Sequence, residues 1–139
     1  MKLVKVLLFL LSFGLSSCAT LCGGARYKAE VIVDNHPSAE IQFNNECIGT
    51  GSALVKIKRR DADNVHFLVK EGGKEQLFSF YSRRFRGWAF VGTLCFWDVY
   101  GVIVDGITGA WWKPNKDEPG VTKLNNKRYR YNLQFHPEQ

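Results

Sequence analysis

The feature that most constrains the fold of this 139-residue sequence is a strict alternation of apolar and polar side chains. Residues 127–135 (KRYRYNLQF) place a large apolar side chain at every second position: Tyr129, Tyr131, Leu133 and Phe135. Residues 27–33 (YKAEVIV) alternate in the same way. Successive side chains of a β-strand point to opposite faces of a sheet, so this period predicts strands with one buried face.

Shorter alternating segments, separated by turn residues, lie between these two. They are residues 39–43, 53–58, 65–69 and 76–81. The pair Asn44–Asn45 can adopt the positive φ of a tight hairpin turn, and Gly72–Gly73 marks another turn. Five short strands in the first half and one at the end predict a mainly β fold. We expect a small antiparallel β-sandwich with an apolar helical or hairpin insertion before the last strand.

The N-terminal residues have the organisation of an export signal. Lys2 and Lys5 flank the start of the ten-residue apolar run 6–15. Ten apolar residues are too few for a transmembrane helix, which needs about 20. Residues 15–18 (LSSC) follow the run and resemble a bacterial lipobox. The resemblance implies cleavage before Cys18 and attachment of a diacylglyceryl group to its thiol.

A protein processed in this way is held at a membrane, because two acyl chains give stable anchoring. Ala19 stands where inner-membrane lipoproteins usually have aspartate, which implies the outer membrane if the host is Gram-negative. The alternative is an ordinary secretory signal followed by an unrelated cysteine. Loss of residues 1–17 removes two lysines and lowers the formal charge from +6 to +4. We therefore expect no nucleic-acid partner, and a basic surface that suits anionic lipid head groups.

A second resemblance covers residues 28–81. Residues 37–41 (PSAEI), 48–50 (IGT) and 69–72 (VKEG) resemble the turn and strand motifs of PEGA-type β-domains. The sequence departs from that pattern at a few turn positions: the glycine before Ala39 is missing, and Asn45 stands where glycine is common. The resemblance implies a structural or ligand-binding domain and carries no catalytic residues.

These features divide the chain into five segments. They are a signal peptide (1–17), a lipidated tether (18–26), a PEGA-like β-domain (27–82), a basic and aromatic glycine-rich apolar segment (83–113), and a loop with the C-terminal strand (114–139).

The most unusual segment is residues 87–112, which hold five glycines, seven aromatic residues and two charges, Asp98 and Asp105. Each aspartate would cost about 2.5–3.5 kcal/mol at the centre of a membrane, so a plain transmembrane helix is disfavoured. Two alternatives remain open: a hairpin in the membrane interface, or ordinary core of a small domain. Residues 105–110 before the final tryptophans resemble the glycine-rich tails of small bacterial lipoproteins, and we interpret Asp105 as a capping or turn residue.

The residues predicted to contact a membrane, an envelope glycan or a protein partner are basic or aromatic. They are Arg83, Arg84, Arg86, Trp88, Trp97, Trp111 and Trp112.

Three cysteines would remain after lipidation. Either Cys47 and Cys95 form a disulfide, leaving Cys22 to pair between molecules, or both are buried free thiols. His36, His66 and His136 have no metal-ligand spacing, and no nucleotide or serine-hydrolase motif is present. We therefore predict no catalytic residues, metal or cofactor.

The sequence predicts a non-enzymatic, lipid-anchored envelope module. The alternatives are a small envelope enzyme or enzyme inhibitor, and a lipoprotein that inserts residues 87–112 into the bilayer.

Overall fold

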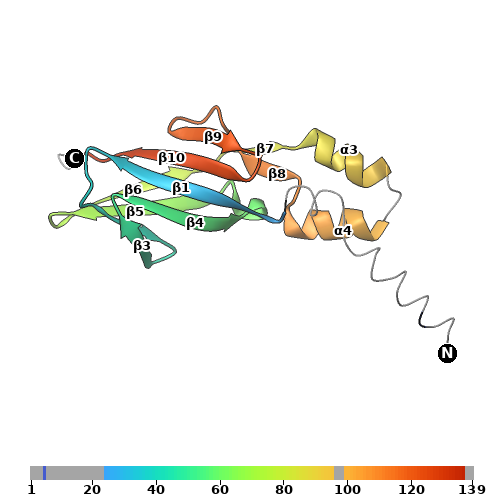
Figure 1. Cartoon of the computed structure of the whole chain (residues 1–139), viewed down its shortest axis with the longest axis horizontal. Coiled ribbons are helices and arrows are strands. Elements are labelled where there is room, and N and C mark those ends of the chain that lie inside the picture. The colour runs from blue at the N-terminus through green and yellow to red at the C-terminus, as the bar shows by residue number, and fades with distance from the viewer. Residues whose placement is uncertain (1–4, 6–23, 96–98, 137–139) are drawn as a thin grey trace.

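The computed structural model describes residue 5, residues 24–95 and residues 99–136. Figure 1 shows an elongated β-sandwich with a pair of helices projecting from one end. The mainly β fold predicted from the alternating segments is therefore confirmed. The apolar insertion, predicted directly before the last strand, precedes the last three strands of the described residues.

The strands of the described residues are short and follow one another closely. They are β1 (Arg26–Asp34), β2 (Glu40–Phe43), β3 (Glu46–Thr50), β4 (Ser52–Lys58), β5 (Val65–Glu71), β6 (Lys74–Phe80), β7 (Arg83–Phe85), β8 (Trp112–Pro114), β9 (Val121–Asn125) and β10 (Arg128–Gln134). The helical elements are the 3-10 turn η1 (Arg59–Asp61) and the helices α3 (Gly87–Cys95) and α4 (Val99–Thr108).

Eight strands form one sheet in the order β6–β5–β2–β3–β4–β1–β10–β9. Strands β3 and β4 share the single register pair Thr50 and Ser52, and the sheet folds over at this point. The ring of Phe67 on β5 consequently lies 5.4 Å from that of Tyr131 on β10. Gly51 permits the bend, because its φ is +64° and a Cβ there would lie 2.5 Å from the carbonyl oxygen of Pro37.

The sandwich is antiparallel except at one place. β1 pairs with β4 in antiparallel fashion on one side and with β10 in parallel fashion on the other. This parallel pair departs from the antiparallel sandwich that the sequence predicts. The alternating residues of β10 all point into the core, as predicted, together with Tyr27 and Val31 of β1. The hydroxyl groups of Tyr27 and Tyr131 lie 2.9 Å apart, and burial raises the pKa of both.

The inserted segment folds as a helical hairpin on a short ribbon. α3 and α4 lie between β7 and β8, which pair with each other in a separate two-stranded sheet. The hairpin form of the insertion is thus observed as two helices. Within the described residues, neither helix is long and apolar enough to cross a membrane.

Candidate functional site

The outer surface of the hairpin is apolar. Each helix exposes large apolar side chains three or four positions apart: Trp88, Val91 and Leu94 on α3, and Val99, Ile103 and Ile107 on α4. This spacing aligns them along one face of each helix. Val99 is 70% exposed and Ile107 is 67% exposed, so the stripes face outward.

The inner surface of the hairpin is small and polar. The buried positions are Ala89 and Thr93 on α3, and Gly101 and Asp105 on α4. The Thr93 hydroxyl lies 2.8 Å from a carboxylate oxygen of Asp105 and 2.9 Å from the carbonyl oxygen of Ala89. Asp105 therefore joins the two helices, rather than capping a helix or a turn as the sequence had suggested. Its side chain is fully buried.

This distribution is the reverse of that in a water-soluble helix pair, which buries large apolar residues and exposes polar ones. Helices packed in lipid instead use small residues and polar contacts at their interface and turn large apolar side chains outward. The hairpin has this second arrangement.

The root of the hairpin, where α4 returns to the sandwich, is tightly packed. Gly109 has a φ of +69°, and a Cβ there would lie 2.5 Å from Cα of Arg60. Arg86 donates from Nη1 to the carbonyl oxygen of Ala110 at 3.1 Å. Trp111 covers the buried Ala110.

A fully buried arginine ties this root to the sandwich. Arg59 donates from Nε to the carbonyl oxygen of Gly24 at 2.9 Å, from Nη1 to that of Trp112 at 3.3 Å, and from Nη2 to that of Asn126 at 2.8 Å. Desolvation, with the nearby charge of Arg86, lowers the pKa of Arg59. One guanidinium thus joins the start of β1, the end of the hairpin and the β9–β10 turn. Nothing in the sequence distinguishes this residue from the exposed arginine that follows it.

The three predicted contact arginines have different environments. Arg83 forms an ion pair with Asp63 at 3.1 Å. Arg84 is exposed and pairs with Asp117 at 2.6 Å. Arg86 is buried, so it belongs to the packing of the root and not to an open contact surface. Of the three, Arg84 is the one most accessible to a partner.

The predicted contact tryptophans also differ in their exposure to solvent. Trp88 is 58% exposed on the first turn of α3. Trp111 packs edge-on against Phe90, with ring centroids 5.1 Å apart, and Trp112 lies in β8 at the root. Trp97 lies outside the described residues. Trp88 therefore belongs to the outer surface of the hairpin, whereas Trp111 and Trp112 are partly buried at its base.

The cysteines differ from both alternatives left open by the sequence. Cys47 and Cys95 are free, so they form no disulfide, and both are exposed rather than buried. Cys47 lies on β3 and Cys95 ends α3, and these two elements lie far apart along the long axis of the molecule (Figure 1). A disulfide requires Cα atoms within about 7 Å. Cys18 and Cys22 lie outside the described residues.

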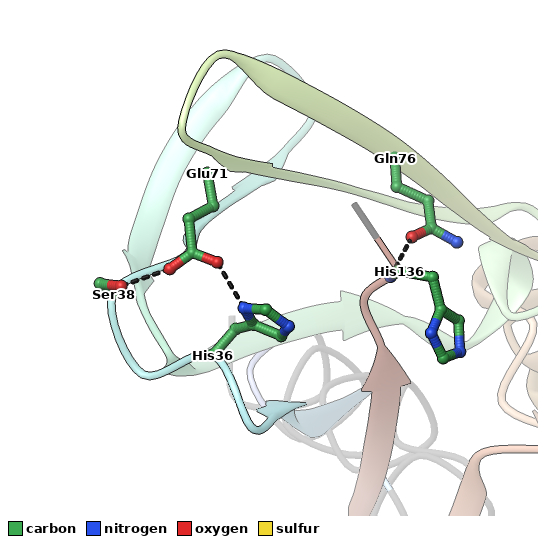
Figure 2. Close-up of polar contacts among 5 residues, drawn as sticks. All are labelled: His36, Ser38, Glu71, Gln76 and His136. Atoms are coloured by element: carbon green, nitrogen blue, oxygen red, sulfur yellow. Dashed lines mark hydrogen bonds and ion pairs between the residues drawn. The ribbon is translucent and has the colours of Figure 1, made fainter. Parts of the chain in front are cut away.

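A second polar cluster lies at the turn between β1 and β2 (Figure 2). Glu71 accepts hydrogen bonds from the Ser38 hydroxyl and, at 2.5 Å, from Nδ1 of His36. Both hydrogen bonds lower the pKa of Glu71, and the bond from Ser38 has the larger effect. Because Ser38 donates to Glu71 and not to His36, the hydroxyl is not aligned for activation by the imidazole. In a separate contact, the backbone N–H of His136 donates to the side-chain oxygen of Gln76 on β6 at 2.9 Å.

The remaining polar features supply little convergent chemistry. Both ring nitrogens of His66 have partners, Ser79 and Asn64, at 2.9 and 2.7 Å. No group of three or more potential metal ligands occurs within residues 24–95 and 99–136. An open groove between β6 and β9 has a volume of about 530 Å³, and Asp34 is the one ionisable residue that lines it.

Comparison with known proteins gives no match: no family model, no curated protein and no solved structure is similar to this chain. Among the described residues, the inverted hairpin is the strongest functional feature, and its role is inferred from its geometry.

Proposed function

We propose that this protein is a non-enzymatic, lipid-anchored module of the cell envelope that holds the membrane at two points. One point is the lipid on Cys18, expected from the lipobox. The other is the helical hairpin, whose outer apolar stripes enter the membrane interface. The observation that carries the proposal is the inverted packing, with Thr93 and Asp105 buried between the helices and Val99 and Ile107 exposed.

The dimensions of the hairpin suit insertion into one leaflet. α3 has nine residues and α4 has ten, so their lengths are about 14 and 15 Å at 1.5 Å per residue. The hydrocarbon core of a bilayer is about 30 Å thick. The hairpin therefore reaches about half-way and is expected to lie in the leaflet without spanning the membrane.

The path of the chain supports the same placement. The carbonyl oxygens of Gly24 and Trp112 bind one guanidinium, that of Arg59, so β1 begins beside the hairpin root. The six steps from Cys18 to Gly24 extend at most about 20 Å. A lipid on Cys18 would therefore hold the hairpin close to the leaflet in which the acyl chains lie.

The chemistry of the outer stripes favours lipid over an envelope glycan, one of the other contacts considered from the sequence. Burying an aliphatic side chain completely stabilises it by about 1.5–3 kcal/mol, and these side chains stand about half exposed in water. Their transfer into lipid would recover several kcal/mol in total. A glycan is usually bound by polar groups and flat aromatic faces, whereas Val91, Leu94, Val99, Ile103 and Ile107 are aliphatic.

The test compares two membrane attachments in one chain. The Cys18→Ser variant is exported with a cleavable secretory signal in place of residues 1–17, and correct cleavage is checked by mass. We expect this unlipidated protein to remain partly with membranes after a carbonate wash. Adding Ile103→Asp and Ile107→Asp should release it into the soluble fraction.

The matched control uses apolar side chains of equal exposure on the sandwich. Leu54 and Leu77 are 54% and 61% exposed, and Leu54→Asp with Leu77→Asp should leave membrane binding unchanged. If the Cys18→Ser protein alone washes off completely, the hairpin is not a membrane contact and the proposal is wrong. If both aspartate pairs release the protein equally, the binding is not specific to the hairpin, which also contradicts the proposal.

A further inference from the structure

Two positive side chains face each other at the root of the hairpin. In the β7–β8 ribbon, Arg84 lies directly opposite Lys113. Cross-strand partners share one face of a sheet, and like charges in this position destabilise it. Asp117 offsets the charge of Arg84, with which it pairs at 2.6 Å, whereas Lys113 forms no ion pair within residues 24–95 and 99–136. An anion held beside Lys113 would supply the missing counter-charge.

Further positive charge surrounds the pair. Burial lowers the pKa of Lys113, and the positive charges of four nearby side chains lower it further. These side chains are Lys123, Arg84, Arg86 and Lys116. Within residues 24–95 and 99–136, the three lysines of this group form no ion pair. The group is therefore a concentrated positive surface with lysine ammonium groups available to a ligand.

Two acidic residues lie in the loop beside this surface. Asp117 pairs with Arg84, and Glu118 accepts from the backbone N–H of Tyr81 at 3.2 Å. Within the described residues, neither carboxylate forms an ion pair with Lys113, Lys116 or Lys123.

The position of the surface matches the depth of lipid head groups. β7 leads into α3 and β8 follows α4, so the ribbon lies at the base of both helices (Figure 1). If the helices enter the leaflet, the ribbon lies where they leave it. Trp88 lies on the first turn of α3, with the guanidinium of Arg86 5.0 Å from its ring centroid. Tryptophan is enriched at this depth of a membrane.

We propose that Arg84, Lys113, Lys116 and Lys123 form a binding surface for the phosphates of anionic phospholipids. This inference rests on the proposed function, because the hairpin must enter the membrane to bring the ribbon to the head groups. Lys113 receives a phosphate together with Arg84, whose guanidinium has N–H donors besides the one that pairs with Asp117. Lys116 in the loop and Lys123 on β9 contact neighbouring head groups. The protein then prefers membrane regions rich in anionic lipid, and the preference weakens with added salt.

The experiment measures binding of the full mature chain carrying Cys18→Ser, so that the acyl chains do not obscure the hairpin. Two kinds of vesicle are compared by sedimentation: phosphatidylcholine alone, and phosphatidylcholine mixed with phosphatidylglycerol. Each positive side chain near an anionic membrane contributes about a fivefold increase in affinity. Lys113→Gln with Lys123→Gln should therefore reduce the preference for the mixed vesicles by about 25-fold.

Two controls separate this surface from net charge and from misfolding. Lys70→Gln with Lys74→Gln removes the same charge at the β5–β6 turn and should retain the preference. Lys113→Arg with Lys123→Arg keeps the charge and should also retain it.

The outcomes distinguish this inference from the proposed function. Equal binding of the unaltered protein to both vesicles overturns the anionic-lipid surface and leaves the hairpin as a membrane contact. Binding to neither vesicle overturns both. An equal loss of preference in the control at the β5–β6 turn, or complete competition by soluble glycerol phosphate at constant ionic strength, also overturns the surface.

Discussion

Replacing Arg59 with lysine tests how the hairpin is held on the sandwich, because the change keeps the charge and removes the forked guanidinium. Arg59 is fully buried and donates to three backbone carbonyls from three separate segments, at 2.8, 2.9 and 3.3 Å. A lysine ammonium is a single point on a flexible stem and cannot reach all three acceptors. We expect the variant to lose two of these bonds.

The size of the effect follows from these contacts. A hydrogen bond to a charged group contributes about 1.5–3 kcal/mol, so the loss of two lowers the free energy of unfolding by about 3 kcal/mol at the lower value. For a domain of this size, 1 kcal/mol corresponds to about 3–6 °C in the melting temperature. Arg59→Lys should therefore melt about 10–15 °C below the unaltered protein.

The assay is thermal unfolding of the detergent-purified protein, followed by circular dichroism, with hydrogen exchange to locate the change. The matched control is Arg60→Lys, since the neighbouring side chain is 53% exposed and pairs only with Asp61 within the described residues. Exchange should accelerate in α3 and α4 before it does in β2 and β5. A melting temperature for Arg59→Lys equal to that of the control would refute the reasoning.

Two further predictions concern other points of the fold. Gly109→Ala should destabilise the protein by about 2–5 kcal/mol in chemical denaturation, because the left-handed backbone and the contact with Arg60 both disfavour a Cβ. The control is Gly92→Ala in α3, where no atom lies within 4 Å of an added Cβ, and this change should be neutral or stabilising. An equal loss of stability in the two variants would contradict this argument. The pKa of Glu71 is lowered on folding, so its contribution is present above pH 4.5 and is lost as the pH falls through the lower folded value. Glu71→Gln should therefore flatten the acid side of the stability profile, whereas Glu75→Gln should not.

The sandwich could be predicted because its strands carry their own signal. Buried and exposed positions alternate in β1 and β10 as the sequence does, and Asn44 and Asn45 have the positive φ expected of their turn. The parallel pairing of β1 with β10 could not be predicted. It joins Glu30 to Arg130, which are 100 residues apart, and no local pattern indicates which strands become neighbours.

The hairpin was only partly predictable for a different reason. Its apolar composition indicated that residues 87–112 are shielded from water. Composition alone does not show whether protein or lipid shields them. The distinction depends on which face holds the small residues, and this needs the partner helix in place. Thr93 gave no signal in sequence, and Asp105 signalled a turn, because the 2.8 Å contact between them exists only once α3 and α4 are packed together.

The pairing of β1 between β4 and β10 has a consequence for how the chain folds. β1 and β4 are close together in the sequence and pair with each other. The parallel partner of β1, β10, is among the last residues described. Contacts between such distant segments form slowly, since a long loop must close first. Because synthesis begins at the N-terminus, the central strand of the sandwich therefore has an unpaired edge until residues 128–134 are made. During that interval the edge can pair with another chain. A tether that fixes each molecule to a membrane would limit such encounters to its immediate neighbours.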